Sequence, residues 1–233
     1  MEILDEDNHI IVCYKPVGIL SQEDESGDID MLRMIKGYIK EKYNKPGEVY
    51  TGLVHRLDRN TDGVMVFAKT SKAASRLSEA IKKHEFNKCY LAVVEGRFKY
   101  KNATGVLEDK LSKDERNKKS FVDKNGKPSK LEYTVLDIIK KDNQEYSLIK
   151  VKLLTGRHHQ IRVQFSSRGF PLYGDIKYGS SNEIGNQYAL SCYYLSFIHP
   201  TLKELREYFY FKPNHIFKCF YQNDDFLEYY KLK

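Results

Sequence analysis

The sequence predicts an α+β fold built on a largely antiparallel sheet. Segments rich in β-branched and aromatic residues outnumber segments with helical periodicity. The connections between the segments are mostly short, which suits antiparallel pairing. The chain has 233 residues, of which 41% are hydrophobic and 30% charged, so it can bury the core of one large domain. We therefore expect one domain over residues 1–233.

The first third of the chain predicts two strands and one helix. Residues 9–20, HIIVCYKPVGIL, begin with an apolar β-branched run that breaks at Pro16 and Gly18, which predicts a strand leading into a tight turn. Apolar residues recur at helical spacing over residues 31–43, despite an internal glycine. The run GVMVFAKT, residues 63–70, predicts a second strand.

The rest of the chain predicts a second clear helix and a series of strands. This helix is expected to begin at Ser71, whose hydroxyl can cap it. The other predicted elements, in chain order, are a strand in KCYLAVVEG (88–96), a charged hairpin or extended loop with a hairpin-type turn at KNGK (97–130), a strand pair around KKDNQ (131–154), a helix in HHQIRVQFSSRG (158–169) and a strand in YALSCYYLSFIHP (188–200).

The distribution of charge favours a polyanionic partner. Lysine and arginine total 39 against 32 aspartate and glutamate residues, which gives a net charge of +7 and a pI of about 9.0. Nearly all of the surplus lies between Arg97 and Lys130, where eleven basic residues stand against five acidic ones. The alternative is a solvated hairpin that contacts no ligand.

The cysteines and the N-terminus bear on location. Cys13, Cys89, Cys192 and Cys219 are far apart and form no C-x-x-C pair, so we expect reduced, buried thiols and neither a zinc site nor disulfides. Residues 1–13 lack the basic start and apolar stretch of a signal peptide, and no apolar run reaches membrane-spanning length. We therefore expect a cytoplasmic protein without membrane contact.

One short stretch concentrates charge beside an apolar run. HRLDRNTDG, residues 55–63, places Asp58 between Arg56 and Arg59, directly before a predicted strand. Taken alone, such a cluster is usually a polar turn whose surface charges pair with one another.

Other blocks of the chain give this cluster a functional interpretation. HRLDRNTDGVMVFAK, KCYLAVVEG and TGRHHQIRVQFSSRGFPLYGDIKYG resemble, in order and approximate spacing, the defining motifs of the RluA-type pseudouridine synthases. IIVCYKPVGIL and LSFIHP resemble the opening and closing elements of the same family. The resemblance covers about residues 3–205, and this combination of motifs is highly specific.

The resemblance implies an isomerase that converts selected uridines of ribosomal or transfer RNA into pseudouridine, without cofactor or metal. It also implies a mixed, largely antiparallel sheet with flanking helices and a central catalytic cleft. Many relatives carry a small RNA-binding domain before the catalytic unit, whereas here the first motif starts about ten residues from Met1. We expect only the catalytic domain over residues 1–233, acting as a monomer on structured RNA with no obligatory protein partner.

Four residues match family positions that have roles in the reaction. Asp58 is expected to be the essential catalytic carboxylate, and the sequence leaves open whether it attacks the sugar, adds to the base or removes a proton. Arg162 is expected to pair with Asp58 across the cleft and keep it ionised. Tyr90 is expected to stack on the target base, although an isolated tyrosine here would be read as a core aromatic. Arg56 is expected to enter the RNA as the base flips out.

Further positions carry weaker expectations. Thr61 and Gly63 are expected to shape the turn that presents the carboxylate, and Arg59 to be only a loop charge. Arg157 and His159 are expected to give support or contact the RNA backbone. Three positions depart from the family pattern, namely Asp62 where serine is common, His158 where threonine is frequent and Ser191 where histidine is usual.

Two alternative functions remain at this stage. A non-catalytic RNA-binding or ribosome-assembly protein could retain the fold, and loss of Asp58, Tyr90 or Arg162 would have favoured it, but all three are present. A uridine-cleaving glycosidase would break the same first bond but release free uracil.

Overall fold

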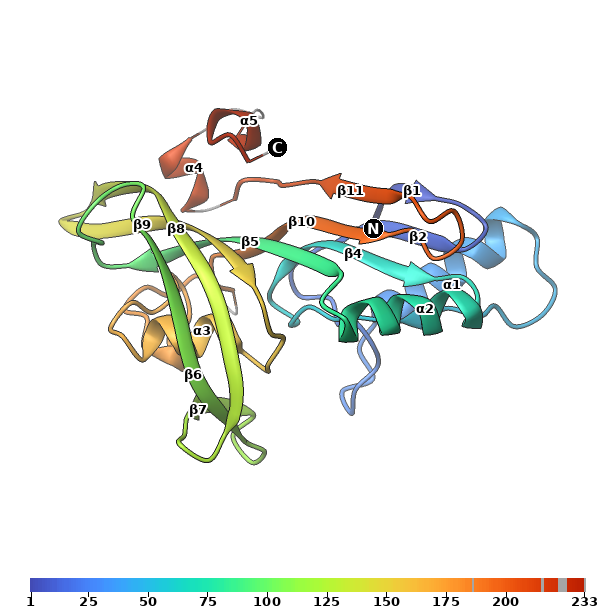
Figure 1. The fold of residues 1–233 in the computed structure, drawn as a ribbon, viewed down its shortest axis with the longest axis horizontal. Coiled ribbons are helices and arrows are strands. Elements are labelled where there is room, and N and C mark those ends of the chain that lie inside the picture. Colours follow the sequence, from blue (N-terminus) through green and yellow to red (C-terminus); the bar gives the residue numbers. More distant parts are fainter. Residues whose placement is uncertain (186, 215, 222–225, 233) are drawn as a thin grey trace. The chain divides into compact units, whose positions relative to one another are not determined.

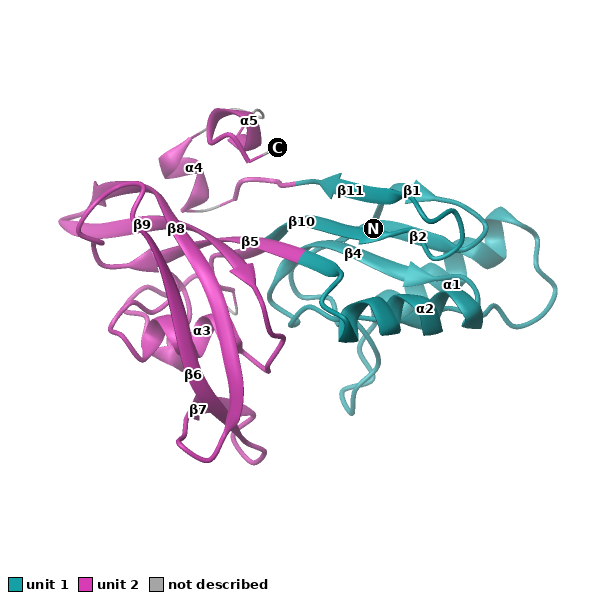
Figure 2. Ribbon diagram, in the orientation of Figure 1, with its two compact units in different colours: residues 1–87, 192–210 teal, residues 88–191, 211–233 magenta. Residues whose placement is uncertain are grey.

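The computed structural model divides the chain into two compact units (Figure 2). Unit 1 comprises residues 1–87 and 192–210, and unit 2 comprises residues 88–191 and 211–233. Each unit therefore combines segments that are far apart in the sequence. The described residues are 1–185, 187–214, 216–221 and 226–232.

Unit 1 contains a largely antiparallel sheet (Figure 1). Its strands pair in the order β1–β2–β4–β10–β11, and the short β3 also pairs with β4. The β1–β2, β2–β4, β3–β4 and β10–β11 pairs are antiparallel. The strand bounds are β1 (Glu2–Glu6), β2 (Ile10–Lys15), β3 (Gly52–Leu53), β4 (Asp62–Ala68), β10 (Leu190–Ile198, its first two residues in unit 2) and β11 (Leu205–Phe209).

The core of unit 1 lies between this sheet and helix α2 (Ser71–Lys82). Ile10 of β2, Val64 of β4 and Leu77 of α2 are buried in one hydrophobic cluster. Every second residue of each strand points to the same face, so these apolar residues meet the apolar side of the helix. Accordingly, α2 packs against β3 and β4.

Side chains cap both helices of unit 1. Asp30 caps α1 (Met31–Lys42), and Thr70 caps α2 by accepting a hydrogen bond from the backbone nitrogen of Ala73. The predicted cap at Ser71 is therefore wrong by one residue. Thr70 has extended backbone angles (φ −138°, ψ 150°), as a cap requires, whereas Ser71 is already helical.

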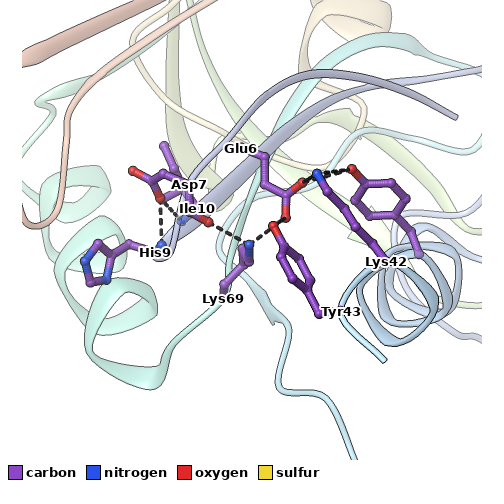
Figure 3. Close-up of polar contacts among 8 residues, drawn as sticks. Glu6, Asp7, His9, Ile10, Lys42, Tyr43 and Lys69 are labelled. Atoms are coloured by element: carbon purple, nitrogen blue, oxygen red, sulfur yellow. Dashed lines mark hydrogen bonds and ion pairs between the residues drawn. The ribbon is translucent and has the colours of Figure 1, made fainter. Parts of the chain in front are cut away.

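A polar network joins β1, α1 and the residue that follows β4 (Figure 3). Glu6 accepts hydrogen bonds from four side chains, namely Lys69 (2.6 Å), Lys42 (2.7 Å), Tyr38 (2.9 Å) and Tyr43 (2.9 Å). Burial alone would raise the pKa of Glu6, but these donors lower it to about 2. The ionised Glu6 carboxylate, at the end of β1, thus holds α1 against that strand.

The strands of unit 2 are also arranged in antiparallel pairs (Figure 1). They pair in the order β5–β9–β8–β6–β7, and each pair is antiparallel. The predicted strand pair around KKDNQ is the β8–β9 hairpin. The strand bounds are β5 (Phe86–Glu95, its first two residues in unit 1), β6 (Thr104–Asp114), β7 (Lys119–Val122), β8 (Lys127–Lys141) and β9 (Gln144–Leu153).

The charged hairpin predicted in residues 97–130 is the antiparallel β6–β7 pair, but KNGK is not its turn and links β7 to β8 instead. At Leu111 of β6, Val122 of β7 is the partner on one side and Lys127 of β8 the partner on the other. The turn therefore links two strands that lie on opposite sides of β6. A Cβ added to Gly126 would lie 2.5 Å from the Leu111 backbone, so this crossing requires glycine.

Short helices complete unit 2. Helix α3 packs against β6, β7 and the 3-10 helix η1, and α4 packs against β8. The bounds are α3 (Gln160–Ser166), η1 (Ile176–Tyr178), α4 (Phe217–Phe220) and α5 (Phe226–Tyr229).

The predicted fold class is confirmed, since a largely antiparallel set of strands is flanked by a few helices. The central cleft and the single domain stay predictions. Cys13, Cys89 and Cys192 are buried, as predicted, but Cys219 is exposed, so its predicted burial is wrong. Among the residues that the structure describes, no helix combines the length and the apolarity that a membrane crossing requires.

Candidate active site

Arg56 and Asp58 lie on the loop of unit 1 between β3 and β4. Arg56 is exposed and Asp58 is half-buried, whereas Leu57 between them is only 5% exposed. His55 is buried as well, and its Nε2 accepts a hydrogen bond from the backbone nitrogen of Val66 (3.1 Å). Buried His55 and Leu57 thus anchor the loop and leave Arg56 in contact with solvent.

Ser21 fastens the residue before Asp58. Its buried hydroxyl donates to the Leu57 carbonyl oxygen (2.7 Å) and accepts from the Leu57 backbone nitrogen (3.1 Å). One side chain thus satisfies both backbone groups of Leu57, as a neighbouring strand would. The sequence reasoning missed Ser21, because nothing in its neighbourhood indicated which residue its hydroxyl would contact.

The turn after β2 fastens Arg59, the residue after Asp58. The Arg59 carbonyl oxygen accepts hydrogen bonds from Lys15 Nζ (3.0 Å) and the Gly18 backbone nitrogen (2.9 Å), and Arg59 Nε donates to the Gly18 carbonyl oxygen (3.0 Å). Its Nη2 also lies 2.7 Å from Asp28 Oδ2. Arg59 was predicted to be only a loop charge, whereas in the structure it holds the loop and the turn together.

Lys15 is completely buried (0% exposed). Its Nζ donates to the Pro16 carbonyl oxygen (3.0 Å) in addition to that of Arg59. Burial lowers the pKa of Lys15 to about 7, although the negative charges of Asp62 and Asp58 oppose this shift. A titratable amine therefore lies beneath the candidate catalytic loop.

The residues after Asp58 lead the loop into β4. The Thr61 backbone nitrogen donates to the Asp58 carbonyl oxygen (3.1 Å), and Gly63 has a φ of 132°. A Cβ added to Gly63 would lie 2.3 Å from a backbone oxygen of β10, so a larger residue would not fit. Asp62 is 2% exposed and accepts a hydrogen bond from the Tyr14 hydroxyl (2.6 Å). As expected, Thr61 and Gly63 shape this turn.

Arg162 lies on α3 in unit 2, where it is 5% exposed. Its Nε and Nη2 donate to the two carboxylate oxygens of Asp175 at 2.7 and 2.8 Å. Its Cζ lies 4.2 Å from the ring centroid of Tyr188 and 4.8 Å from that of Tyr178. The sequence reasoning missed these three partners, although Asp175 and Tyr178 both belong to the GDIKYG part of the matched motif.

Tyr90 lies on β5 in unit 2. It is 4% exposed and pairs in register with Val151 of β9. This buried position is the one expected if Tyr90 is an aromatic residue of the core. Base stacking by Tyr90 stays a prediction.

The residues before α3 are held by several polar contacts. The Gln160 side chain accepts hydrogen bonds from Thr155 Oγ1 (2.9 Å) and the Arg157 backbone nitrogen (3.0 Å). His159 Nδ1 shares a hydrogen bond with the Tyr178 hydroxyl (2.9 Å). Burial first, and then the neighbouring positive charges, lower the pKa of His159 to about 2, so this imidazole is neutral. RNA contacts of Arg157 and His159 stay predictions.

The predicted site residues thus fall into two sets. Arg56 and Asp58 share one loop of unit 1, whereas Tyr90 and Arg162 belong to unit 2. The pairing of Arg162 with Asp58 and the RNA contact of Arg56 stay predictions. Within the described ranges, no group of three or more His, Cys, Asp or Glu residues could hold a metal ion.

Sequence relatives of the chain are RNA-modifying enzymes by name. It is 33% identical over 207 residues to the uncharacterized RNA pseudouridine synthase YhcT of Bacillus subtilis (strain 168), covering 88% of this chain and 66% of that protein. It is 38% identical over 182 residues to the ribosomal large subunit pseudouridine synthase D of Borreliella burgdorferi, covering 76% of this chain and 54% of that protein. The chain thus spans about two thirds or less of the length of these relatives.

Two solved human structures share the fold. RNA pseudouridylate synthase domain containing 1 aligns with a TM-score of 0.74 and 23% identity, covering 92% of this chain and 84% of that one. RNA pseudouridylate synthase domain containing 4 aligns with a TM-score of 0.71 and 22% identity, covering 91% and 89%. The signature of the RNA pseudouridylate synthases matches residues 9–167, which is more than half of the sequence. As the resemblance to the RluA-type enzymes predicted, the chain belongs to the RNA pseudouridylate synthase family.

Proposed function

We propose that this chain is an RNA pseudouridine synthase, an isomerase that acts on selected uridines of ribosomal or transfer RNA. The observation that carries the proposal is the fastening of the Asp58 loop. In a member of this family, Ser21 and the turn after β2 hold the residues on both sides of the matched carboxylate. A loop held in this way presents the carboxylate in a constant position, as nucleophilic or general-base chemistry requires.

The reaction exchanges one glycosidic bond for another. The bond between N1 of uracil and C1′ of ribose breaks, the freed base rotates, and C5 bonds to C1′. C5 then loses its proton and N1 gains one, so the product is an isomer and no co-reactant is consumed. Asp58 supplies the carboxylate that attacks the sugar, adds to the base or removes a proton.

Three further residues assist this reaction in the proposal. The target uridine must leave its stack, which costs a few kcal/mol. Arg56, exposed two residues before Asp58, enters the RNA in place of the base. Tyr90 stacks on the flipped base, and Arg162 pairs with Asp58 to keep it ionised.

Ribosomal or transfer RNA is the proposed substrate, and the cytoplasm the proposed location. The net charge of +7 supports a polyanionic substrate, and one relative is named a ribosomal large subunit pseudouridine synthase. In the proposal residues 1–233 act as one catalytic domain, as a monomer and without an obligatory protein partner.

The test uses the proton that C5 loses. RNA labelled with tritium at C5 of uridine, prepared from cells that lack this protein, is incubated with the purified chain. A synthase releases tritium to water and leaves no free uracil. Free uracil would instead indicate a glycosidase, and RNA binding without tritium release would indicate a non-catalytic RNA-binding protein.

A further inference from the structure

Three lysines from two parts of unit 2 gather at the tip of β6 and β7. Lys118 ends the β6–β7 loop, Lys119 is the first residue of β7, and Lys177 lies on η1. The Lys177 ammonium donates hydrogen bonds to the backbone oxygens of Asn117 (2.7 Å) and Lys118 (2.9 Å). These bonds hold the loop on η1, so the three lysines form one cluster, called here the tip cluster.

The tip cluster sits on a fixed support. The backbone nitrogen of Ser120 donates to the Tyr178 hydroxyl (2.7 Å), which joins β7 to η1 immediately beside the cluster. Lys119 Nζ lies 5.1 Å from the Tyr178 ring centroid, and Tyr178 is only 5% exposed. Because these contacts position the loop, its backbone does not have to be ordered when a ligand arrives.

The carboxylates near the tip cluster, those of Asp114 and Asp175, interact with Lys177 but form no close ion pair with it. Within the described part of the chain, no carboxylate lies within salt-bridge distance of Lys118, Lys119 or Lys177, and all three side chains are exposed. The Asp114 carboxylate accepts hydrogen bonds from the Asn117 side chain (2.6 Å) and from two backbone nitrogens of the loop. The Asp175 carboxylate is bound by Arg162.

The protonation of neighbouring groups reflects this excess of positive charge. Burial first, and then the charges of Arg162 and Lys119, lower the pKa of Lys177. The pKa of His159 is lowered for the same two kinds of reason, and Lys177 is among the charges that contribute. An anion that binds beside these like charges reduces the repulsion between them.

We propose that the tip cluster binds the phosphate backbone of the RNA substrate. The proposal rests on the proposed function for the identity of the polyanion. It places an RNA contact in unit 2 on residues that have no part in the proposed chemistry. Lysine ammonium groups bind phosphates as point charges and do not read bases, so this contact positions the RNA without selecting its sequence.

The test compares two pairs of adjacent lysines with the same change of charge. In one variant Lys118 and Lys119 are both replaced by glutamine, and in the control Lys140 and Lys141, which are exposed at the β8–β9 turn, are replaced in the same way. RNA affinity of each protein is measured by titration at several salt concentrations. A third variant, Lys177→Arg, keeps the charge of the cluster and should bind RNA like the wild type.

Loss of two phosphate contacts should flatten the slope of log affinity against log salt by about 1.4, and lower affinity on the order of tenfold at 0.15 M salt. The control variant should bind like the wild type. Equal affinity and slope in the Lys118→Gln, Lys119→Gln variant, or an equal loss in the control, would overturn the proposal. Because binding is measured without turnover, a wild type that binds RNA but releases no tritium would count against the proposed function only.

Discussion

The two regions that carry the candidate site residues hold their charged groups in different ways. In unit 1, the described fastenings of Asp58 act on the backbone of its neighbours, through Ser21, Lys15 and Gly18. In unit 2, the guanidinium of Arg162 is held directly, by one carboxylate and two aromatic rings. The loop is thus held through backbone groups on either side of Asp58, whereas Arg162 is held through its own side chain, in part by the ion pair with Asp175.

The difference bears on what a substitution does in each region. Removing a carboxylate from the unit 1 loop leaves the backbone bonds on either side of it in place, so the loop should keep its shape. Removing the carboxylate from the unit 2 pair takes a bidentate partner from a buried cation, so the effect should include stability. Each of the following substitutions tests one side of this contrast.

The largest expected effect on activity comes from Asp58→Asn. Tritium release should fall below detection, because an amide cannot act as nucleophile or base, while thermal unfolding should stay close to that of the wild type. Arg56→Lys, which keeps a positive charge on the same loop, serves as a control for folding. Turnover near the wild-type rate in the Asp58→Asn protein would show that this carboxylate is not the reacting group.

The next largest effect is expected from Asp175→Ala. The change leaves the Arg162 guanidinium buried without its carboxylate and should lower the free energy of unfolding by about 3–5 kcal/mol, measured by urea denaturation. Adding Arg162→Met should restore most of this stability, because no unpaired charge remains, but it should not restore tritium release. If the double variant is as unstable as Asp175→Ala alone, the ion pair is not what Asp175 contributes.

A smaller effect is expected from Ser21→Ala. The change leaves both backbone groups of Leu57 without the Ser21 hydroxyl, so the free energy of unfolding should fall by about 1–3 kcal/mol. Because the loop shifts, kcat should fall between about tenfold and a hundredfold, with little change in KM, since the buried Ser21 does not touch RNA. Ser26→Ala removes an exposed hydroxyl of the same segment and is the matched control. An unchanged kcat would show that the other fastenings suffice.

How much of the fold could be predicted from the sequence depends on how far apart in the sequence the interacting residues lie. Periodicity located β4, α2 and the β8–β9 hairpin, because a hydrophobic pattern depends on residues that are close in the sequence. It could not choose between Thr70 and Ser71 as the cap, because both carry a hydroxyl and backbone angles decide. The KNGK turn was found from composition, but composition does not state which side of β6 each strand joins.

The candidate site shows the same limit. The matched motifs supplied Asp58, Arg56, Tyr90 and Arg162, but not the residues that hold them. Ser21 contacts a residue 36 positions away, and a serine in a loop has no pattern that indicates its partner. Partners such as Ser21 can be recognised only when the fold brings distant segments together.

The last effect concerns pH and the buried Lys15, which helps to hold the Asp58 loop. The pKa of Lys15 is about 7 in the folded chain, against 10.5 for an ordinary lysine. Between these values the unfolded chain binds a proton that the folded chain does not, so this group makes the folded state more stable as pH rises from about 7 to about 10. The gain in stability is at most about 1.4 kcal/mol for each pH unit.

The variant Lys15→Met has no titratable amine at this position. In urea denaturation experiments, the difference in free energy of unfolding between the wild type and Lys15→Met should therefore rise over that pH range. The control is Lys36→Met, which replaces an exposed lysine of α1. The difference between the wild type and this control should stay constant. A constant difference between the wild type and Lys15→Met would mean that Lys15 keeps its proton in the folded chain, and that the loop is fastened by a fixed charge.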